Sequence, residues 1–268
     1  MSYQNHILSL QSAVMAGSVG NNAAMAIYNH FKLEAYCLDT VRLAAHPGYG
    51  EMGRDITSAD TLEMLLSDFQ RLPASGHLAI IQTGYLGAEE QVEVLAHHIA
   101  KMKEKNAVSY CLDPVMGDSG RLYIADSLAD KMAQNLLPLA DIITPNLFEF
   151  ERLTQTRFTN AEQLTRTAQQ LGRTYGLKAI LITGVPVDGA IADMLITSDT
   201  STPFIHPVRE QGFSGAGDVL TALFIAGLMG GKSYPEAAQD ASRLVTACAA
   251  QADDPRDIAV RRWLAGLN

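Results

Sequence analysis

Short apolar runs rich in β-branched residues alternate with longer amphipathic stretches along the 268 residues of the chain. The runs are short and bounded by polar or turn residues, which predicts β-strands. Strand and helix in repeated alternation favour a mostly parallel sheet with helices on both faces. No linker, repeat or low-complexity segment interrupts this pattern, so we expect one α/β domain over residues 1–268. The predicted strands are 6–10, 35–43, 78–83, 108–113, 141–144 and 179–183.

The clearest helical patterns follow the third and fifth of these strands. The segment 160–171 begins with Asn160, a suitable N-cap, and carries a glutamine three residues later. Charged neighbours predict that His97 and His98 lie on a solvated face, and the polar segment 197–203 predicts a hairpin turn. The earlier helix has apolar residues at helical spacing, at Val92, Leu95, Ile99 and Met102.

Composition narrows the range of partners. The net charge is −9 and no run of lysine or arginine occurs, so we expect neither nucleic acid nor an anionic membrane as a partner. The three cysteines are far apart and lack the spacing of a disulfide framework or a zinc site, which fits a reducing cytoplasm. We see no secretory leader and no apolar run of the roughly 18 residues that a membrane span needs, so we expect a soluble, cytoplasmic protein.

Residues 212–233 read GFSGAGDVLTALFIAGLMGGKS and contain two glycine-rich candidates for phosphate binding. The second has the length of a P-loop, which would use Lys232 and Ser233. A P-loop follows a strand, whereas these glycines follow a helical pattern. They therefore predict a helix C-cap at Gly230 and Gly231, with another helix starting near Pro235.

The first candidate, SGAGD at 214–218, directly precedes that helix. Free N–H groups and the helix dipole favour an anion at such a place. Asp218 would lie in the first turn, where it could take a proton from a hydroxyl while a phosphoryl group sits on the glycine loop, as in a kinase. Read alone, the segment is equally compatible with Ser214 as an ordinary N-cap and Asp218 as a first-turn acid.

Other loops at strand ends also carry acids, and ligands gather at the carboxyl ends of strands in such sheets. Asn146 and Glu149 stand three residues apart at a helix start, which suits a hydrated Mg²⁺ shared with nucleotide phosphates. The same spacing also fits a capping box. Asp113 ends another strand, and Asp118 follows it together with two glycines. This segment could supply a metal-linked acid and a flexible cover over the site. It could also be merely a turn. Three acid-bearing loops at successive strand ends favour a nucleotide and Mg²⁺ site over three unrelated local structures.

These segments together resemble the ribokinase-like superfamily and, within it, the pyridoxal kinases. The resemblance covers nearly the whole chain and keeps the order of the motifs. It implies a ribokinase-like domain that transfers the γ-phosphoryl group of ATP to the 5′-hydroxymethyl group of pyridoxal, pyridoxine or pyridoxamine. It also implies a homodimer. The matching strings are SLQSAVMAGSVGNNAA, QTGYLG, CLDPVMGDSGRLYI, ADIITPNLFEFERLT and SGAGDVLTALFIAG.

The resemblance implies roles for individual residues. Asp218 matches the catalytic base, Ser12 the serine that hydrogen-bonds the pyridine ring, and Tyr85 an aromatic residue packed near that ring. The anion hole is matched by Gly215, Ala216 and Gly217.

Further matches concern the nucleotide and its cations. The residues matched to ATP binding are Asp113, Asn146, Thr183, Ser214 and the lid residue Tyr123. The residues matched to Mg²⁺, or to an activating K⁺ or Na⁺ near the phosphates, are Asp113, Asp118, Thr144 and Glu149.

The chain departs from the family where pyridoxal kinases commonly read SNHTGY or SNTPHY. Here the segment is AAHPGY, so Ala44, Ala45 and Pro47 replace polar side chains of the vitamer pocket. Each lost hydrogen bond corresponds to about 0.5 to 1.5 kcal/mol, or roughly three- to tenfold in affinity. His46 is a candidate for a substitute contact with the substrate, by hydrogen bonding or by stacking.

Three alternative functions stay open at this stage. One is a related kinase acting on hydroxymethylpyrimidine. Another is a non-catalytic vitamer-binding protein on the same fold, motivated by the AAHPGY segment. A Rossmann dehydrogenase is weakly suggested by GSVGNNAA, but the G-x-G-x-x-G spacing is absent.

Overall fold

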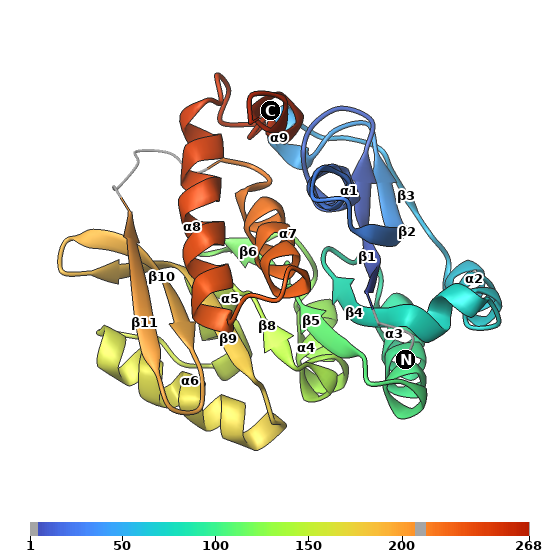
Figure 1. Cartoon of the computed structure of the whole chain (residues 1–268), viewed down its shortest axis with the longest axis horizontal. Coiled ribbons are helices and arrows are strands. Elements are labelled where there is room, and N and C mark those ends of the chain that lie inside the picture. The colour runs from blue at the N-terminus through green and yellow to red at the C-terminus, as the bar shows by residue number, and fades with distance from the viewer. Residues whose placement is uncertain (1–4, 207–212, 268) are drawn as a thin grey trace.

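The alternation of strands and helices forms one central sheet in the computed structural model, which describes residues 5–206 and 213–267 (Figure 1). Over these residues the sheet has nine strands in the order β11-β10-β9-β8-β5-β4-β1-β2-β3. Six adjacent strands of this order are parallel, namely β9, β8, β5, β4, β1 and β2. The outer strands β3, β10 and β11 are antiparallel to their neighbours. The strands are β1 (His6–Val14), β2 (Glu34–Leu43), β3 (Arg54–Ile56), β4 (Leu78–Thr83), β5 (Ser109–Leu112), β8 (Ile142–Ile143), β9 (Ala179–Val187), β10 (Ala190–Ile196) and β11 (Ser201–His206).

All six predicted strands are therefore present, and the mostly parallel α/β sheet is confirmed. The polar segment 197–203 includes the turn between β10 and β11, where Thr197 N–H donates to Thr200 O at 3.0 Å. A separate two-stranded hairpin, β6 (Gly117–Asp118) and β7 (Arg121–Leu122), projects from the segment after β5.

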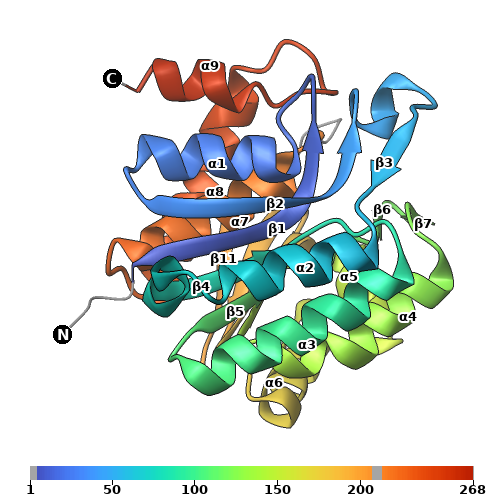
Figure 2. The same ribbon diagram turned by 90° about the vertical axis from the view of Figure 1, so that its right-hand side faces the viewer.

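Helices cover both faces of the sheet (Figure 2). One layer holds α1 (Gly20–His30), α7 (Ala216–Met229), α8 (Tyr234–Ala250) and α9 (Val260–Ala265). The other layer holds α2 (Ala59–Phe69), α3 (Glu89–Lys105), α4 (Asp126–Asn135), α5 (Leu147–Thr154) and α6 (Ala161–Tyr175). Short 3₁₀ turns lie at Pro47–Tyr49, Pro73–His77 and Leu137–Leu139.

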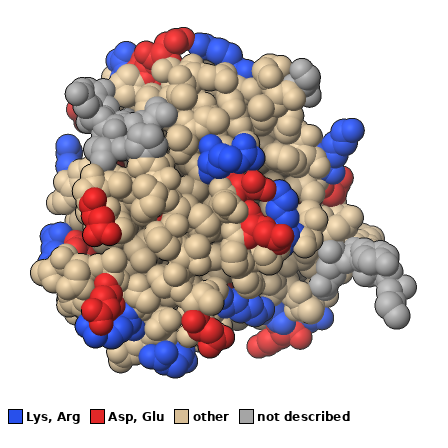
Figure 3. Space-filling model, turned by 60° about the vertical axis from the view of Figure 1, so that its left-hand side comes forward, with Lys and Arg blue, Asp and Glu red and all other residues tan. Residues whose placement is uncertain are grey.

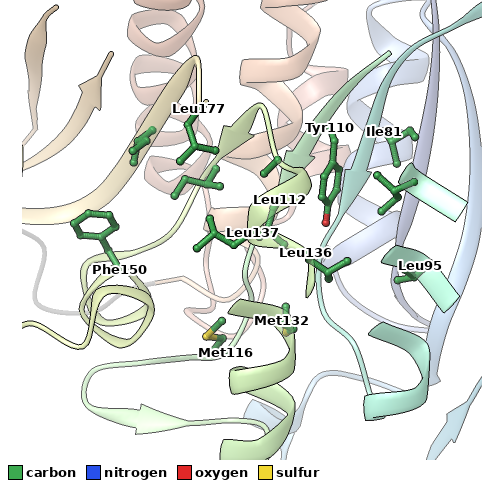
Figure 4. Packing of buried hydrophobic residues seen from close by; sticks show 14 of the residues in the cluster. Ile81, Leu95, Tyr110, Leu112, Met116, Met132, Leu136, Leu137, Phe150 and Leu177 are labelled. Atoms are coloured by element: carbon green, nitrogen blue, oxygen red, sulfur yellow. The ribbon is translucent and has the colours of Figure 1, made fainter. Parts of the chain in front are cut away.

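The inner strands are buried on both faces, because successive side chains point to opposite helical layers. Ile80 of β4 packs with the α1/α7/α8 layer, and its neighbour Ile81 packs with the α2–α6 layer. The same division separates Ile142 from Ile143 on β8. Figure 4 shows part of the core between the sheet and the α2–α6 layer, including Ile81 and residues from α3, α4 and α5. Continuous apolar strands are therefore what this architecture requires.

The predicted helix signals are largely confirmed. All four apolar residues of the α3 stripe are buried, and Asn160 caps α6 by accepting a hydrogen bond from Gln163 N–H at 2.8 Å. The prediction is wrong for His98, which is buried between α2 and α3. Its Nε2 lies 2.9 Å from Glu63 Oε2, so a polar partner on the neighbouring helix allows the ring to be buried. His97 is exposed, as predicted.

The end of α7 confirms that the second glycine stretch is no P-loop. Gly230 is the C-cap, and Gly231 has φ 84°, a left-handed conformation that favours glycine. The Lys232 ammonium pairs with Asp240, and Ser233 forms a capping box with Glu236 at the start of α8. Both residues thus serve the connection between two helices.

Within residues 5–206 and 213–267, no helix is both long enough and apolar enough to cross a membrane. On the face drawn in Figure 3, basic and acidic side chains are interspersed among other residues.

Candidate active site

The N-terminal end of α7 lies against the carboxyl ends of the central strands. The first contact is made by the segment between β1 and α1. Gly215, the N-cap of α7, has φ 88°, and a Cβ built on it would lie 2.0 Å from Ser18 O. Glycine is therefore required at 215 both by the left-handed backbone and by the approach of another chain segment.

The loop before α7 is also fixed by backbone hydrogen bonds. Ala216 N–H donates to Phe213 O at 3.1 Å, and Ser214 N–H donates to Pro255 O at 2.9 Å. No side chain of the described residues caps the helix, which leaves its N-terminal dipole facing the strand ends. The N-cap is Gly215, so the interpretation of Ser214 as an ordinary N-cap is wrong.

Asp218 lies in the first turn of α7, and its carboxylate accepts a hydrogen bond from Gly20 N–H. Gly20 is the first residue of α1, so the carboxylate is close to the N-terminal ends of two helices. Burial raises the pKa of Asp218 to about 6, and the bond from Gly20 opposes that rise. A Cβ on Gly20 would lie 2.1 Å from Ser12 O, so this approach again depends on glycine.

Thr221 joins α7 to two strand ends. It lies one turn after Asp218 and is fully buried. Its Oγ1 is 3.2 Å from Asp113 Oδ2, just beyond β5, and 2.9 Å from Thr144 Oγ1, just beyond β8. A hydroxyl has one proton, so a chain in which Thr144 donates to Thr221 and Thr221 donates to Asp113 satisfies both contacts. This residue was missed in the sequence, where its signal was a polar side chain within an apolar helix.

The capping box predicted as one reading of Asn146 and Glu149 is present. Asn146 Oδ1 accepts from Glu149 N–H, and Glu149 Oε2 accepts from Asn146 N–H, each at 2.9 Å. Glu149 Oε1 also accepts from Met116 N–H at 2.9 Å and Gly117 N–H at 3.4 Å. Asn146 Nδ2 donates to Gly117 O at 2.8 Å. The pair therefore caps α5 and anchors the base of the β6–β7 hairpin.

The acids at the strand ends influence one another. Burial, followed by the charges of Glu149 and Asp218, raises the pKa of Asp113 well above its usual range. Burial raises the pKa of Glu149 to about 8, against the effect of its three backbone N–H donors, and the charge of Asp118 adds to the rise. Mutual repulsion of this kind fits a place where a cation binds.

The geometry restricts how that cation would be held. Among the described residues, no three His, Cys, Asp or Glu side chains are grouped for direct coordination of a metal. Both oxygens of Glu149 already accept backbone hydrogen bonds. The donor set therefore fits a hydrated Mg²⁺, which usually keeps several of its waters.

The other matched residues lie around this centre. Thr183 of β9 forms a parallel bridge with Asn146, and its N–H donates to Pro145 O at 3.0 Å. Asp118 is exposed on β6, where its Oδ1 accepts from Ser119 N–H at 2.6 Å. Tyr123 follows β7 and its side chain is 55% exposed.

On the side of β1 and β2, Ser12 is buried in β1 and Tyr85 is partly buried after β4. The carbonyl of Tyr85 accepts a hydrogen bond from Thr40 Oγ1 at 2.6 Å, which fixes the backbone of that loop. His46 precedes the turn Pro47–Tyr49 and is partly buried.

Comparisons with known proteins identify the family of the chain. The family described as phosphomethylpyrimidine kinase matches residues 54–259. The pyridoxal kinase of Rubrobacter xylanophilus is 30% identical over 240 residues, which cover 87% of this chain and 82% of that protein. The chain belongs to the pyridoxal kinase family.

Solved structures of pyridoxal kinases share the fold. The enzyme from Entamoeba histolytica superposes with a TM-score of 0.93 at 24% identity, covering 99% of this chain and 96% of the other. The enzyme from Leishmania donovani, solved with ADP and pyridoxamine, superposes with a TM-score of 0.88 at 23% identity, covering 98% and 95%. The chain therefore has the same fold as these solved pyridoxal kinases.

The two glycines of the loop make a matched test of this geometry. Gly215→Ala should lower the free energy of unfolding by about 1 to 3 kcal/mol from backbone strain alone, with the clash at Ser18 O adding to it. Gly217→Ala meets nothing within 4 Å and should raise stability, by about 0.4 to 1 kcal/mol. Urea denaturation measures both. Equal stabilities of the two variants would contradict the close approach of the 12–20 segment.

Proposed function

We propose that this protein is an ATP-dependent pyridoxal kinase, which transfers the γ-phosphoryl group to the 5′-hydroxymethyl group of pyridoxal, pyridoxine or pyridoxamine. The observation that carries the proposal is the position of Asp218. Its carboxylate lies in the first turn of α7, is held by an amide at the start of α1, and is close enough to Asp113 to raise the pKa of that acid. A base beside an anion-binding helix end is what phosphoryl transfer to an alcohol needs.

In this mechanism Asp218 accepts the proton of the substrate CH₂OH as the substrate oxygen attacks the γ-phosphorus, while the bond from that phosphorus to the β,γ-bridging oxygen breaks and ADP leaves. A pKa of about 6 leaves the group mostly ionised near pH 7 while keeping it more basic than an exposed aspartate. The anion hole of Gly215, Ala216 and Gly217, together with the positive end of the α7 dipole, stabilises charge on the transferred group. Ala216 contributes mainly by shaping the turn, since its amide already bonds to Phe213 O.

The acids bind the cations that accompany ATP. Asp113, with Thr144 beside it, and Glu149, acting through its charge and through water, would hold a hydrated Mg²⁺, which neutralises phosphate charge. Asp118 and Thr144 would serve a K⁺ or Na⁺ near the phosphates. The proposed contacts of ATP itself are Asp113, Tyr123, Asn146, Thr183 and Ser214.

The vitamer lies, in this proposal, between β1 and the loops after β2 and β4. Ser12 would hydrogen-bond the pyridine ring and Tyr85 would pack near it. His46 belongs to the AAHPGY segment, where alanine and proline replace the polar residues common in the family. We expect weaker vitamer binding than in relatives that keep those side chains.

We also propose a homodimer acting in the cytoplasm. β3 pairs with β2 only over Val41–Leu43, so the preceding residues of β2 form an open sheet edge within the described structure. Cys37, Cys111 and Cys248 are free thiols, which suits a reducing compartment.

The decisive experiment measures ADP release with pyridoxal, pyridoxine, pyridoxamine and hydroxymethylpyrimidine. We expect turnover with at least one B6 vitamer and little with the pyrimidine. Hydroxymethylpyrimidine is included because the matching family is described as phosphomethylpyrimidine kinase. Turnover of the pyrimidine alone would replace the proposed substrate. Tight vitamer binding without ADP release would indicate a non-catalytic binding protein.

Asp218→Asn should remove the base while preserving most of the local packing. We expect kcat to fall by about 10² to 10⁴ with the fold and nucleotide affinity nearly unchanged. Steady-state kinetics and calorimetric titration of the nucleotide measure these quantities. Wild-type turnover in this variant would exclude Asp218 from the mechanism.

The pH dependence follows from the raised pKa. The base works only when deprotonated, so activity is present above the pKa and is lost as pH falls through it. We expect kcat/KM for the vitamer to decrease about tenfold per pH unit below about pH 6. A profile between about pH 4.5 and 8 tests this, and kcat/KM that stays nearly constant down to about pH 5, as an ordinary aspartate with a pKa of about 3.9 would give, would contradict it.

A further inference from the structure

The segment between α8 and α9 contains a tight turn, Asp254–Asp257, that the proposed function leaves unused. Asp257 N–H donates to Asp254 O at 3.0 Å, which closes the turn, and Pro255 occupies its second position. We call these four residues the C-terminal turn. The carbonyls of its two central residues take no part in the closing bond, so they are available to other segments.

These two carbonyls hold two different parts of the active site. Pro255 O accepts from Ser214 N–H at 2.9 Å, immediately before the anion hole. Arg256 O is 2.5 Å from His46 Nε2, in the loop that carries the AAHPGY segment. Successive Cα atoms across a trans peptide are about 3.8 Å apart, so a movement of the turn displaces both contacts together.

The side chain of Arg256 adds a second link. Its guanidinium pairs with Asp254, with Nε 3.0 Å from Oδ1 and an amino group 2.8 Å from Oδ2. The same group lies over the ring of Tyr49, 4.8 Å from its centroid. The ring centroid of Tyr49 is also 5.0 Å from that of His46. The C-terminal turn therefore contacts this loop both through the backbone carbonyl of Arg256 and through its side chain.

The contacts of His46 explain its place in this link. A carbonyl can only accept, so Nε2 carries the proton toward Arg256 O, and Nδ1 accepts from Gly48 N–H at 3.0 Å. Both ring nitrogens are therefore used within the protein. Gly48 leaves room for the ring, because a Cβ there would lie 2.3 Å from His46 Cε1.

We infer that the C-terminal turn is a positioning element, which holds the vitamer loop at residues 44–49 in register with the anion hole at 215–217. His46 acts as a positioning residue within it and not as a hydrogen-bonding partner of the substrate. This inference rests on the proposed function for the roles of the two loops. Its contacts, however, belong to the protein alone and can be tested without turnover.

Two exposed arginines give a matched kinetic test. Arg256→Ala removes the contact with Tyr49, whereas Arg262→Ala removes an exposed pair with Asp253 that does not reach the loop. We expect Arg256→Ala to raise KM for pyridoxal about two- to fivefold and KM for Mg–ATP by a smaller factor, because Arg256 contacts Tyr49 directly and reaches Ser214 only through the backbone of Pro255. Arg262→Ala should match wild type. Equal values for the two variants would overturn the inference.

Two substitutions of His46 separate positioning from substrate contact. Glutamine places its amide nitrogen near the position of Nε2 and can still donate to Arg256 O. Asparagine replaces only the Nδ1 acceptor. We expect His46→Asn to raise KM for pyridoxal about three- to tenfold and His46→Gln to restore most of the loss. Equal losses in both variants would show that donation to Arg256 O does not determine KM for pyridoxal and would overturn the positioning role.

Amide hydrogen exchange tests the link independently of activity. Arg256→Ala should accelerate exchange at both Gly48 N–H and Ser214 N–H, which lie on separate segments, and Arg262→Ala should change neither. Unchanged exchange at these amides in Arg256→Ala would refute the coupling. Absence of ADP release from the wild-type chain with every vitamer would refute the proposed function instead, and the exchange result would still decide the inference.

Discussion

The site depends on two places where one backbone approaches another too closely for a side chain. Ser12 O and Ser18 O occupy the positions that Cβ atoms on Gly20 and Gly215 would need. Both glycines have positive φ, so they also provide the backbone conformation at the start of α1 and α7. As a result the N-terminal ends of two helices meet, and Asp218 receives an amide from one while belonging to the other.

A rigid helix carries this arrangement. The residues from Val219 to Ala226 are buried, so α7 is surrounded by protein along most of its length. Thr221 ties the helix to the strand ends through Asp113 and Thr144. The β6–β7 hairpin, in contrast, is a small two-stranded unit held at its base by Asn146 and Glu149. The proposed catalytic base and the proposed cover over the site thus belong to different elements.

Glu149 shows that a structural and a functional interpretation of one residue need not compete. Its carboxylate caps α5, anchors the hairpin and raises the pKa of Asp113 by its charge. A divalent cation near these acids would relieve their repulsion. The residue that completes a helix therefore also supplies charge to the proposed nucleotide site, and its backbone bonds limit it to an indirect role in metal binding.

The sequence by itself determined the mostly parallel sheet, both helical layers, the C-cap at Gly230 and the acid in the first turn of α7. These features follow from local periodicity and from glycine, which act over a few neighbouring residues. The roles of matched residues came from resemblance and stay proposals. Tertiary structure alone decided the contact of Thr221 with two strands, the burial of His98 and the engagement of His46 by the C-terminal turn. Those contacts join residues far apart in the chain, and a local pattern carries no information about which distant group packs against it.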